Sequence, residues 1–242
     1  MTETKTYLST MGFHESFVLR LLSRTNATRD DELVIVVPRP VIGGVAEAID
    51  SLKASCSRMR YPEPRVEEIE LGDFPSTLSR ILDVVLSSKG VIHANLSVGL
   101  RSMDVLILLA ILLSRKPFFA YLMSESGEGH DIVIKGDEVY SLLKEYTVED
   151  LKLLHVISRK GEVTLSELAS ELGKSEKTVV NRLNELKKAG LVVIKGKDKG
   201  VSLTQLGNVV LKMRSLERVE SASALENSFN SMKDQHESLF TS

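Results

Sequence analysis

The sequence predicts an α/β protein in which a doubly wound, mostly parallel sheet is followed by a winged helix-turn-helix domain. Two observations lead to this fold class. Strand-like and helix-like apolar patterns alternate through the first three-fifths of the 242 residues, as they do in consecutive βαβ units. Residues 164–207 then have the pattern of two short amphipathic helices and a hairpin with a basic tip, a shape that enters the DNA major groove.

The first domain, residues 1–134, is expected to contain six strands and four helices. The strands are predicted at 5–9, 32–37, 65–70, 90–95, 118–123 and 131–134, and the helices at about 15–25, 44–57, 75–88 and 99–115. In the common strand order 3-2-1-4-5, the first and fourth strands are neighbours and a crevice opens above their carboxyl ends. The loops that follow these two strands are therefore the expected place for a ligand.

The loop after the first strand contains Gly12, where the backbone can turn tightly or approach a ligand closely. Thr10 adds a hydroxyl, and the N–H groups at the start of the following helix can bind an anion. The loop after the fourth strand repeats this arrangement around Gly99 and adds the guanidinium of Arg101, which suits a phosphate. The predicted ligand-binding residues are Thr10, Met11, Gly12, Phe13, His14, Asn95, Leu96, Ser97, Val98, Gly99 and Arg101.

A structural role is the alternative for both loops. Gly12 and Gly99 would then serve tight turns, and Asn95 and Ser97 would cap the following helix. Two polar, glycine-bearing loops that face one crevice favour a ligand site over this alternative. The sequence has neither G-x-G-x-x-G after its first strand nor G-x-x-x-x-G-K-[ST], so it carries no dinucleotide fingerprint and no P-loop.

The helix pair of the second domain has clear start and stop signals. Thr164 and Glu167 predict a capping box, and Gly173 predicts the end of the first helix. Ser175 is the expected N-cap of the second helix, which ends at Gly190. Its buried face is predicted to consist of Val179, Val180, Leu183 and Leu186.

The outer face of this second helix then carries Glu176, Lys177, Thr178, Asn181, Arg182 and Glu185. Arginine suits guanine and asparagine suits adenine in the major groove. Residues 191–195 and 201–203 alternate like strands around a glycine-bracketed turn with lysines, which indicates a wing that follows the DNA backbone. An ordinary solvated helix face is the alternative. The predicted DNA-binding residues are Ser175, Glu176, Lys177, Thr178, Asn181, Arg182, Lys195, Lys197 and Lys199.

Charge separates the same segments. Residues 147–214 contain 13 Lys and Arg against 8 Asp and Glu, whereas residues 1–146 contain 16 against 20. The tail, residues 215–242, contains 2 against 5. A basic segment inside a mildly acidic chain is what binding to the phosphates of DNA requires.

A polar linker is expected at residues 135–146, and the DNA-binding domain at residues 147–214. Thr147 and Asp150 predict a capping box for its first helix, whose apolar face carries Leu151, Leu154 and Ile157. In the tail, Leu225, Phe229, Met232 and Leu239 are spaced as on a weak helical seam. A partly helical or disordered end and a further dimer contact are equally open for this tail.

Composition limits the protein class. The single cysteine, Cys56, excludes a disulfide within the chain, and we expect it to pack as a small apolar residue on a helix. The five histidines are scattered, so neither a zinc site nor any other cofactor is predicted. No signal peptide is apparent, and the longest apolar run, 105–113, is too short to span a bilayer. We therefore expect a soluble, cytoplasmic protein.

In the loops after the first and fourth strands the chain resembles a known family, the CRISPR-associated Rossmann-fold (CARF) regulators, in which a Rossmann-like domain precedes a winged helix-turn-helix. The resemblance covers residues 4–206 and is carried by Gly12-Phe13 after the first strand and by Asn95, Ser97, Gly99 and Arg101 after the fourth. Many relatives have two glycines where this chain has Val98 and Gly99. The resemblance implies that the first domain binds a cyclic oligoadenylate, with cyclic tetra-adenylate the expected ring, made as an alarm signal in antiviral defence. It also implies that the second domain binds promoter DNA and regulates CRISPR-associated genes.

A homodimer is expected on physical grounds. The helix at 99–115 is apolar nearly all round beyond Asp104, so one face can cover the sheet while the other needs a partner. Burial within the same subunit, near Phe118 and the flanking helices, is the alternative. In a twofold dimer the two crevices merge, and the four phosphates of a cyclic tetranucleotide would meet paired Arg101 side chains and helix N-termini. Two recognition helices would then read a palindromic operator with half-sites about one helical turn, or a multiple, apart.

Two other functions are open to this sequence. Some related domains are similar to slow ring nucleases, in which the ribose 2'-hydroxyl attacks the phosphate, and Thr10, His14, Ser97 and Arg101 are the residues available for such a role. A metabolite-responsive winged-helix regulator unrelated to defence is the second alternative. The expectation is a regulator without enzymatic activity. Activation, repression and a promoter-dependent mixture of the two are all open for its effect on transcription.

Overall fold

The computed structural model describes residues 4–124, 131–196 and 200–214. The chain divides into two compact units, unit 1 (Met1–Val139) and unit 2 (Tyr140–Ser242). The predicted wing lysines Lys197 and Lys199 and the tail 215–242 lie outside the described residues, so the predictions made for them stay predictions.

Unit 1 is built on one six-stranded sheet with the order β3-β2-β1-β4-β5-β6. The strands are β1 (Lys5–Thr10), β2 (Glu32–Arg39), β3 (Pro64–Glu70), β4 (Val91–Asn95), β5 (Phe118–Leu122) and β6 (Ile132–Lys135). The first five are parallel, and β6 runs antiparallel to β5 at the edge. The predicted order of the first five strands is confirmed, and β1 and β4 are neighbours as expected.

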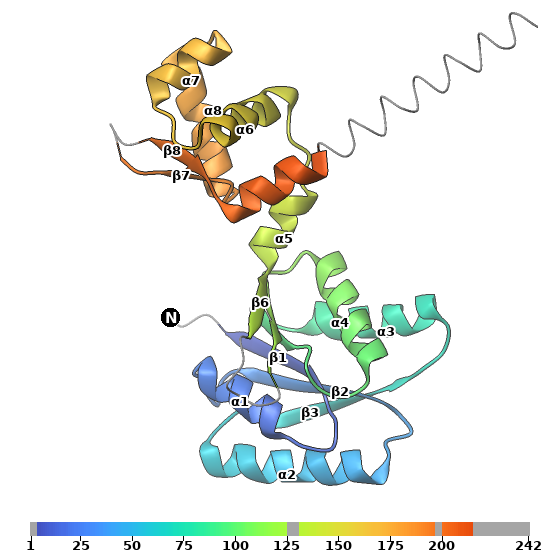
Figure 1. Cartoon of the computed structure of the whole chain (residues 1–242). Helices are drawn as coiled ribbons and strands as arrows, with labels where there is room; N and C mark the ends of the chain where they lie inside the picture. Colours follow the sequence, from blue (N-terminus) through green and yellow to red (C-terminus); the bar gives the residue numbers. More distant parts are fainter. Residues whose placement is uncertain (1–3, 125–130, 197–199, 215–242) are drawn as a thin grey trace, which may run out of the picture. The chain divides into compact units, whose positions relative to one another are not determined.

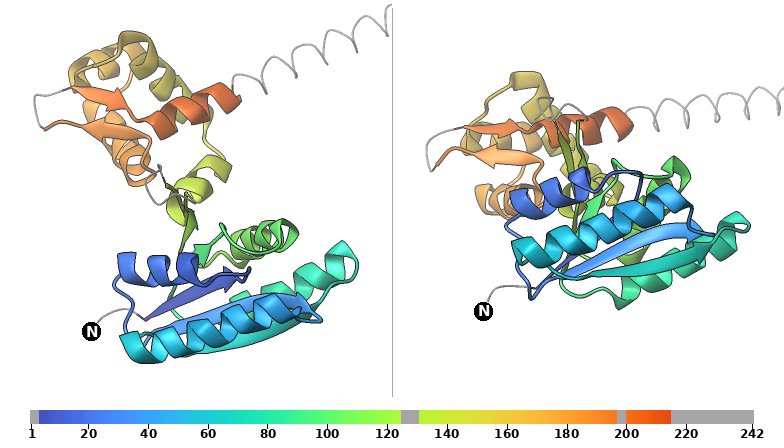
Figure 2. Two further views of the ribbon diagram at one scale, coloured as in Figure 1. Left: turned by 60° about the horizontal axis from the view of Figure 1, so that its bottom comes forward. Right: turned by 90° about the horizontal axis from the view of Figure 1, so that it is seen from below.

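Two helices cover each face of this sheet (Figures 1 and 2). They are α1 (Ser16–Arg24) and α2 (Gly43–Met59) on one face, and α3 (Phe74–Ser87) and α4 (Arg101–Ser114) on the other. Valine, isoleucine and leucine fill β2, whose five central residues are all buried because both faces of the strand are covered. Under α1 and α2 the core includes Leu21, Leu22, Ile35 and Leu52. The doubly wound prediction is confirmed.

The segment expected as a polar linker is mostly helical. Helix α5 (Gly136–Leu143) begins directly after β6, and the boundary between the two units falls inside it, after Val139. Gly136 is required at its start because a Cβ there would lie 2.8 Å from the ring of Phe118. The sequence had suggested a connection but not its helical form.

Unit 2 is a winged helix-turn-helix. Helices α6 (Val148–Lys160), α7 (Leu165–Leu172) and α8 (Glu176–Lys188) precede the hairpin β7 (Val192–Ile194) and β8 (Val201–Leu203), and residues 205–214 add a last helical segment. The three predicted N-caps are all present, since Thr147, Thr164 and Ser175 each accept a backbone hydrogen bond from the third helical residue. Thr147 with Asp150 and Thr164 with Glu167 form the predicted capping boxes.

One core cluster holds unit 2 together, with Leu154, Ile157, Leu168, Leu183 and Leu186 among its members. The prediction that Val180 lies on the buried face of α8 was wrong. Val180 is 37% exposed because only every third or fourth position of α8 points inward, and Val179, Leu183 and Leu186 occupy those positions.

Cys56 is buried on α2, as predicted, and burial raises the pKa of its thiol to about 11. Across the described residues, no helix combines the length and the apolar character needed to cross a membrane.

Substitution Thr164→Ala is expected to lower the free energy of unfolding of unit 2 by about 1 kcal/mol, because the first turn of α7 loses its side-chain acceptor. Denaturant unfolding followed by circular dichroism measures this change. Ser170→Ala, at an exposed position on the same helix, is the matched control and should leave the stability nearly unchanged. Equal losses in both variants would contradict the capping role.

Candidate ligand cleft and nucleic-acid interface

The loops after β1 and β4 pack against each other backbone to backbone. A Cβ placed on Gly12 would lie 3.4 Å from both the backbone nitrogen of Gly99 and Cγ1 of Val98. Gly99 has φ +79°, and a Cβ there would lie 2.8 Å from Oγ1 of Thr10 and 2.9 Å from the carbonyl oxygen of Met11. Gly99 is therefore required twice, by its left-handed conformation and by the close approach of the other loop. The two predicted loops do converge.

A pocket of about 370 Å³ opens between these loops, and we call it the switch-point cleft. It is lined by Met11, Gly12, Phe13, Pro38, Pro40, Val41, Ile42, Val45, Gly99 and Leu100. The wall is almost wholly apolar. Phe13 is 64% exposed, and its ring lies against Gly44, where a Cβ would come within 2.9 Å. Such a wall suits the flat face of an aromatic base.

The third side of the switch-point cleft, residues 38–42, was missed from the sequence. This segment comprises the last two residues of β2 and the loop after it, and β2 pairs with β1 on the side opposite β4. The predicted strand order already placed the carboxyl end of β2 next to that of β1. The segment carries no polar signature, however, and so was not selected.

Three of the four helices that start at the carboxyl edge of β1–β4 share one property. The N-caps of α1, α2 and α4 are Glu15, Ile42 and Leu100, and none of them makes a side-chain capping hydrogen bond. In contrast, α3 and the helices α6, α7 and α8 are all capped by side chains. First-turn N–H groups without a side-chain acceptor, together with the helix dipole, favour an anion. Arg101, exposed at the start of α4, adds a full positive charge.

The predicted ligand-binding residues separate into two groups. Gly12, Phe13, His14, Gly99 and Arg101 lie wholly or partly at the surface, where a ligand can reach them. The side chains of Thr10, Asn95, Leu96 and Val98 are buried, and Ser97 is half-buried, so these residues shape the loops from within, whereas the buried Met11 also lines the cleft. The sequence could not separate the groups because alternation along a strand does not continue into a loop.

The alternative that Asn95 and Ser97 cap the helix is wrong. Helix α4 begins only at Arg101, beyond the reach of either side chain. Oδ1 of Asn95 accepts from the backbone N–H of Ser97 at 3.1 Å, and Oγ of Ser97 accepts from the N–H of Met123 at 2.7 Å. The hydroxyl of Ser97 also lies 3.3 Å from the carbonyl oxygen of Tyr121. These bonds tie the end of β4 to the end of β5.

In unit 2, most residues of the predicted DNA-binding face of α8 are exposed. Glu176, Lys177, Thr178 and Asn181 point away from the core, and Ser175 lies at the exposed N-cap. Asn184, which the sequence analysis left out, is also exposed and lies one turn beyond Asn181 on the same face. The 3.6-residue period alone would have included it.

Arg182 has a structural role that its sequence position did not indicate. Its guanidinium donates to Oδ1 of Asp150 at 2.9 Å and to Oγ1 of Thr147 at 3.1 Å, and it pairs with Glu149 at 3.4 Å. Burial opposes ionisation of Asp150, but the hydrogen bonds from Thr147 and Arg182 outweigh it and lower the pKa of this carboxyl. Arg182 thus ties α8 to the start of α6, and its predicted contact with DNA stays a prediction.

The described part of the wing includes one predicted lysine. Nζ of Lys195 pairs with Oε2 of Glu162 at 2.9 Å, and both side chains are about half exposed. A surface pair of this kind is weak, so Lys195 stays available to a phosphate.

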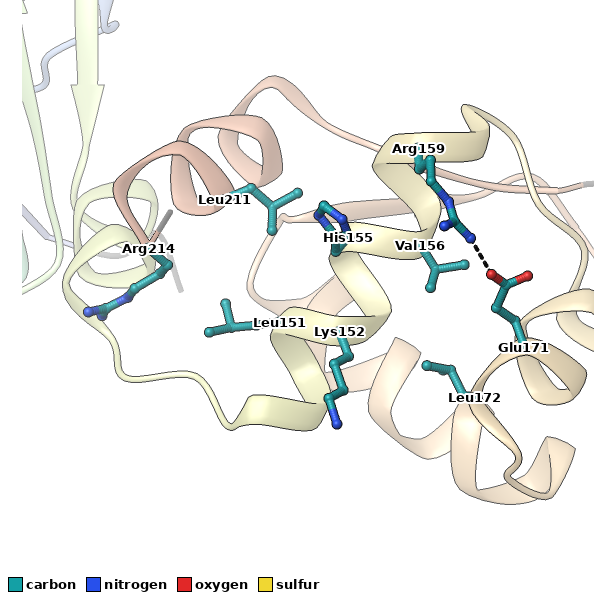
Figure 3. A pocket seen from close by; sticks show the side chains of 9 residues that line it. All are labelled: Leu151, Lys152, His155, Val156, Arg159, Glu171, Leu172, Leu211 and Arg214. Carbon is teal, nitrogen blue, oxygen red and sulfur yellow. Dashed lines mark hydrogen bonds and ion pairs between the residues drawn. The ribbon is translucent and has the colours of Figure 1, made fainter. Parts of the chain in front are cut away.

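A separate hollow of about 360 Å³ lies in unit 2 (Figure 3). Its lining consists of Leu151, Lys152, His155, Val156, Arg159, Glu171, Leu172, Leu211 and Arg214. These residues come from α6, the end of α7 and the last helical segment, and none comes from α8 or the described wing. Arg159 and Glu171 form an ion pair at its rim (Figure 3). This hollow is separate from the predicted DNA-binding face.

The outward face of α4 is apolar and uncovered within the described chain. Met103, Ile107, Ala110 and Ile111 are buried against unit 1, whereas Val105 and Leu113 are 58% and 59% exposed. Burial within the same subunit, the alternative considered from the sequence, is therefore not complete. No group of three or more His, Cys, Asp or Glu side chains with the arrangement of a metal site occurs in the described parts of the chain.

Both units match known protein-family models. Residues 5–134 match the family model of the Csa3 CRISPR-associated Rossmann-like domain, and residues 145–204 match the model HVO_A0114. Over 209 residues the chain is 45% identical to Csa3 of Saccharolobus solfataricus, a CRISPR locus-related protein whose name proposes that it binds DNA. The alignment covers 86% of this chain and 88% of that relative.

Solved structures of bacterial regulators are also similar to this chain. The MarR repressor of Listeria monocytogenes is 20% identical with a TM-score of 0.32, over 43% of this chain and 81% of the other. The MepR–DNA complex of Staphylococcus aureus is 18% identical with a TM-score of 0.30, over 40% and 85%. At these TM-scores, the winged-helix assignment rests on the elements of unit 2 themselves.

Removal of the contact between Arg182 and Asp150 should lower the free energy of unfolding of unit 2. In a double-mutant cycle of Arg182→Ala and Asp150→Ala, we expect a coupling of about 0.5–1 kcal/mol in the free energy of unfolding, because solvent screens a partly exposed pair. Chemical denaturation of the four proteins measures it. Lys177→Ala on the same helix should cost almost no stability, and zero coupling between positions 182 and 150 would refute the tie.

Proposed function

Because the chain belongs to the family of Csa3 CRISPR-associated proteins with a Rossmann-like domain, we propose that it is a ligand-responsive transcription regulator. Unit 1 binds a cyclic oligoadenylate, and unit 2 binds promoter DNA of CRISPR-associated genes. The observation that carries the proposal is the convergence of the β1 and β4 loops at the switch-point cleft, in a chain whose other unit is a winged helix.

The chemistry of the switch-point cleft supports an oligonucleotide ligand. A cyclic oligoadenylate combines anionic phosphates with flat, largely apolar bases. The three helix starts without side-chain caps and Arg101 provide donors and positive charge for phosphates. Phe13 and the apolar residues of the cleft provide a surface on which an adenine can stack. Both chemical parts of the ligand thus have a matching part of the cleft.

A homodimer completes the proposed site. The exposed apolar side chains Val105 and Leu113 on α4 lie on the helix that begins at Arg101. Pairing of two copies about a twofold axis along this face would bury apolar surface and place two Arg101 side chains near one symmetric ligand. Cyclic tetra-adenylate, with four phosphates and compatible symmetry, is the ring we propose.

DNA binding is assigned to α8 and the wing. Lys177, Thr178 and Asn181 present a cation, a hydroxyl and an amide from one exposed helix face. An amide suits an adenine edge, whereas the lysine suits a backbone phosphate. Residues 147–214 contain 13 Lys and Arg against 8 Asp and Glu in a chain whose formal net charge is -2, and this local excess of positive charge favours association with DNA.

We propose sensing without cleavage of the ligand. Of the four residues considered for a ring nuclease, Thr10 is buried and Ser97 is engaged with the end of β5. His14 and Arg101 are exposed, but Arg101 is assigned to phosphate binding. The alternative of a metabolite-responsive regulator unrelated to defence is tested by comparing the binding of cyclic tetra-adenylate with that of ATP and AMP.

Substitution Arg101→Ala should weaken binding of cyclic tetra-adenylate about tenfold or more, because a charge-assisted phosphate contact is lost. Isothermal titration calorimetry with the ring, ATP and AMP measures both affinity and selectivity. Arg29→Ala is the matched control, since Arg29 is exposed and precedes β2 at the opposite edge of the sheet. Binding of ATP or AMP in preference to the ring would support the metabolite alternative, and recovery of linear product after long incubation would support a nuclease.

On promoter DNA, Asn181→Ala should lower affinity for the specific site about tenfold without changing the salt dependence, because only a base contact is lost. Lys177→Ala should instead reduce the slope of log affinity against log salt by about 1. Fluorescence anisotropy at several salt concentrations separates the two effects. Lys53→Ala on α2 removes the same charge outside unit 2 and should leave the slope unchanged. Unchanged binding in both α8 variants would rule out α8 as the recognition helix.

A further inference from the structure

A buried polar cluster lies directly beneath the switch-point cleft. Oγ1 of Thr10 contacts the carbonyl oxygen of Val98 and also Oδ1 of Asp104, the latter at 2.9 Å. Thr10 is 1% exposed and Asp104 is 6% exposed. The cluster joins the end of β1, the loop after β4 and the first turn of α4, which are the segments that carry the cleft.

The two contacts of Thr10 can both be hydrogen bonds at once only when the carboxyl of Asp104 is protonated. A threonine hydroxyl carries one hydrogen, and a backbone carbonyl can only accept. An ionised carboxylate can also only accept, so Thr10 would have two acceptors and one hydrogen. Both contacts are satisfied when Thr10 donates to Val98 and Asp104 donates its own proton to Oγ1 of Thr10.

The surroundings of Asp104 favour this neutral form. Its second oxygen, Oδ2, is buried and has no hydrogen-bond partner among the described residues. An ionised carboxylate with such an oxygen would lose hydration without compensation. Burial raises the pKa of Asp104 to about 6, although a hydrogen bond donated by Thr10 to the ionised carboxylate and the nearby positive charge of Arg101 act in the opposite direction.

Few charges face Asp104. Arg101, on the same helix, is the charged group that acts on it. On α3, which packs against α4, Arg80 and Asp83 are exposed, and on β1 the charged residue Lys5 lies at the far end and donates to Thr25. The remaining titratable side chain of the adjacent strands β1 and β4, apart from Tyr7, is His93, which hydrogen-bonds with Tyr121.

We propose that Asp104 is a positioning residue whose neutral form holds the two cleft loops together, and that binding of an anionic ligand converts its carboxyl from the ionised to the neutral form with uptake of a proton from solvent. The proposal rests on the proposed function. A phosphate held by Arg101 withdraws the positive charge that favours the carboxylate, and its own negative charge disfavours ionisation further. A neutral Asp104 also leaves the charge of Arg101 uncompensated for the ligand.

The test is calorimetry of cyclic tetra-adenylate binding in buffers of different ionisation enthalpy, from pH 5.5 to 7.5. Wild type should take up protons on binding, approaching one per subunit above pH 6, and its affinity should fall roughly tenfold or more across this range. Asp104→Asn, which keeps the shape and a donor but cannot ionise, should bind without this proton uptake and with little pH dependence. Asp83→Asn, at an exposed position of α3, should behave as wild type.

Equal proton uptake in wild type and Asp104→Asn, or none in wild type, would overturn the proposal. Two ligand-free measurements separate it from the proposed function. Wild type should lose stability relative to Asp104→Asn as pH rises from about 4 to 6, because the folded carboxyl binds its proton more tightly than the unfolded one, and the difference should stay constant above that range. Carbon NMR of the Asp104 carboxyl in wild type reports its titration even if the variant does not fold. A normal titration there refutes the neutral acid, whereas absence of ring binding to wild type refutes the proposed function alone.

Discussion

The close packing of two loop backbones at the centre of the sheet is the contact on which the candidate site depends. Gly99 lies against Thr10 and Met11, and Gly12 lies against Gly99 and Val98. A side chain at Gly99 would not fit, because its Cβ would lie 2.8 Å from Oγ1 of Thr10. This approach sets the width of the switch-point cleft and aims the starts of α1 and α4 at one place. It follows from the parallel order of β1 and β4, whose carboxyl ends must meet at the same edge.

The site therefore has an inner layer and an outer layer. Inside, Thr10, Asn95, Ser97 and Asp104 use hydrogen bonds to hold the loops in place. Outside, backbone N–H groups, Phe13 and the guanidinium of Arg101 face solvent. A cleft of this kind binds through backbone and apolar surface more than through polar side chains. That division fits the helix starts, since α1, α2 and α4 begin here without side-chain caps, whereas α6, α7 and α8 of unit 2 begin with side-chain N-caps.

Unit 2 shows the same separation of supporting and presenting residues. Arg182 supports α8 from α6, so Lys177, Thr178, Asn181 and Asn184 are left to face outward. A charged residue on an exposed helix face can therefore also support the packing of that helix. In both units, a polar residue that a motif selects serves the scaffold whenever a neighbouring element brings it a partner.

The sequence by itself determined the strand order, the helix pair with its caps and the convergence of two loops, because apolar periodicity and capping residues are local and repeat over many positions. It did not determine which residues of those loops are reachable, the apolar third wall of the cleft at 38–42, or the helical form of α5. It also could not show that Val180 is exposed, that Arg182 is paired, or that the buried Asp104 contacts Thr10. Those properties depend on which side chains from distant segments meet. Only the tertiary structure decides this, because burial and hydrogen-bond partners are set by packing and not by neighbours in the chain.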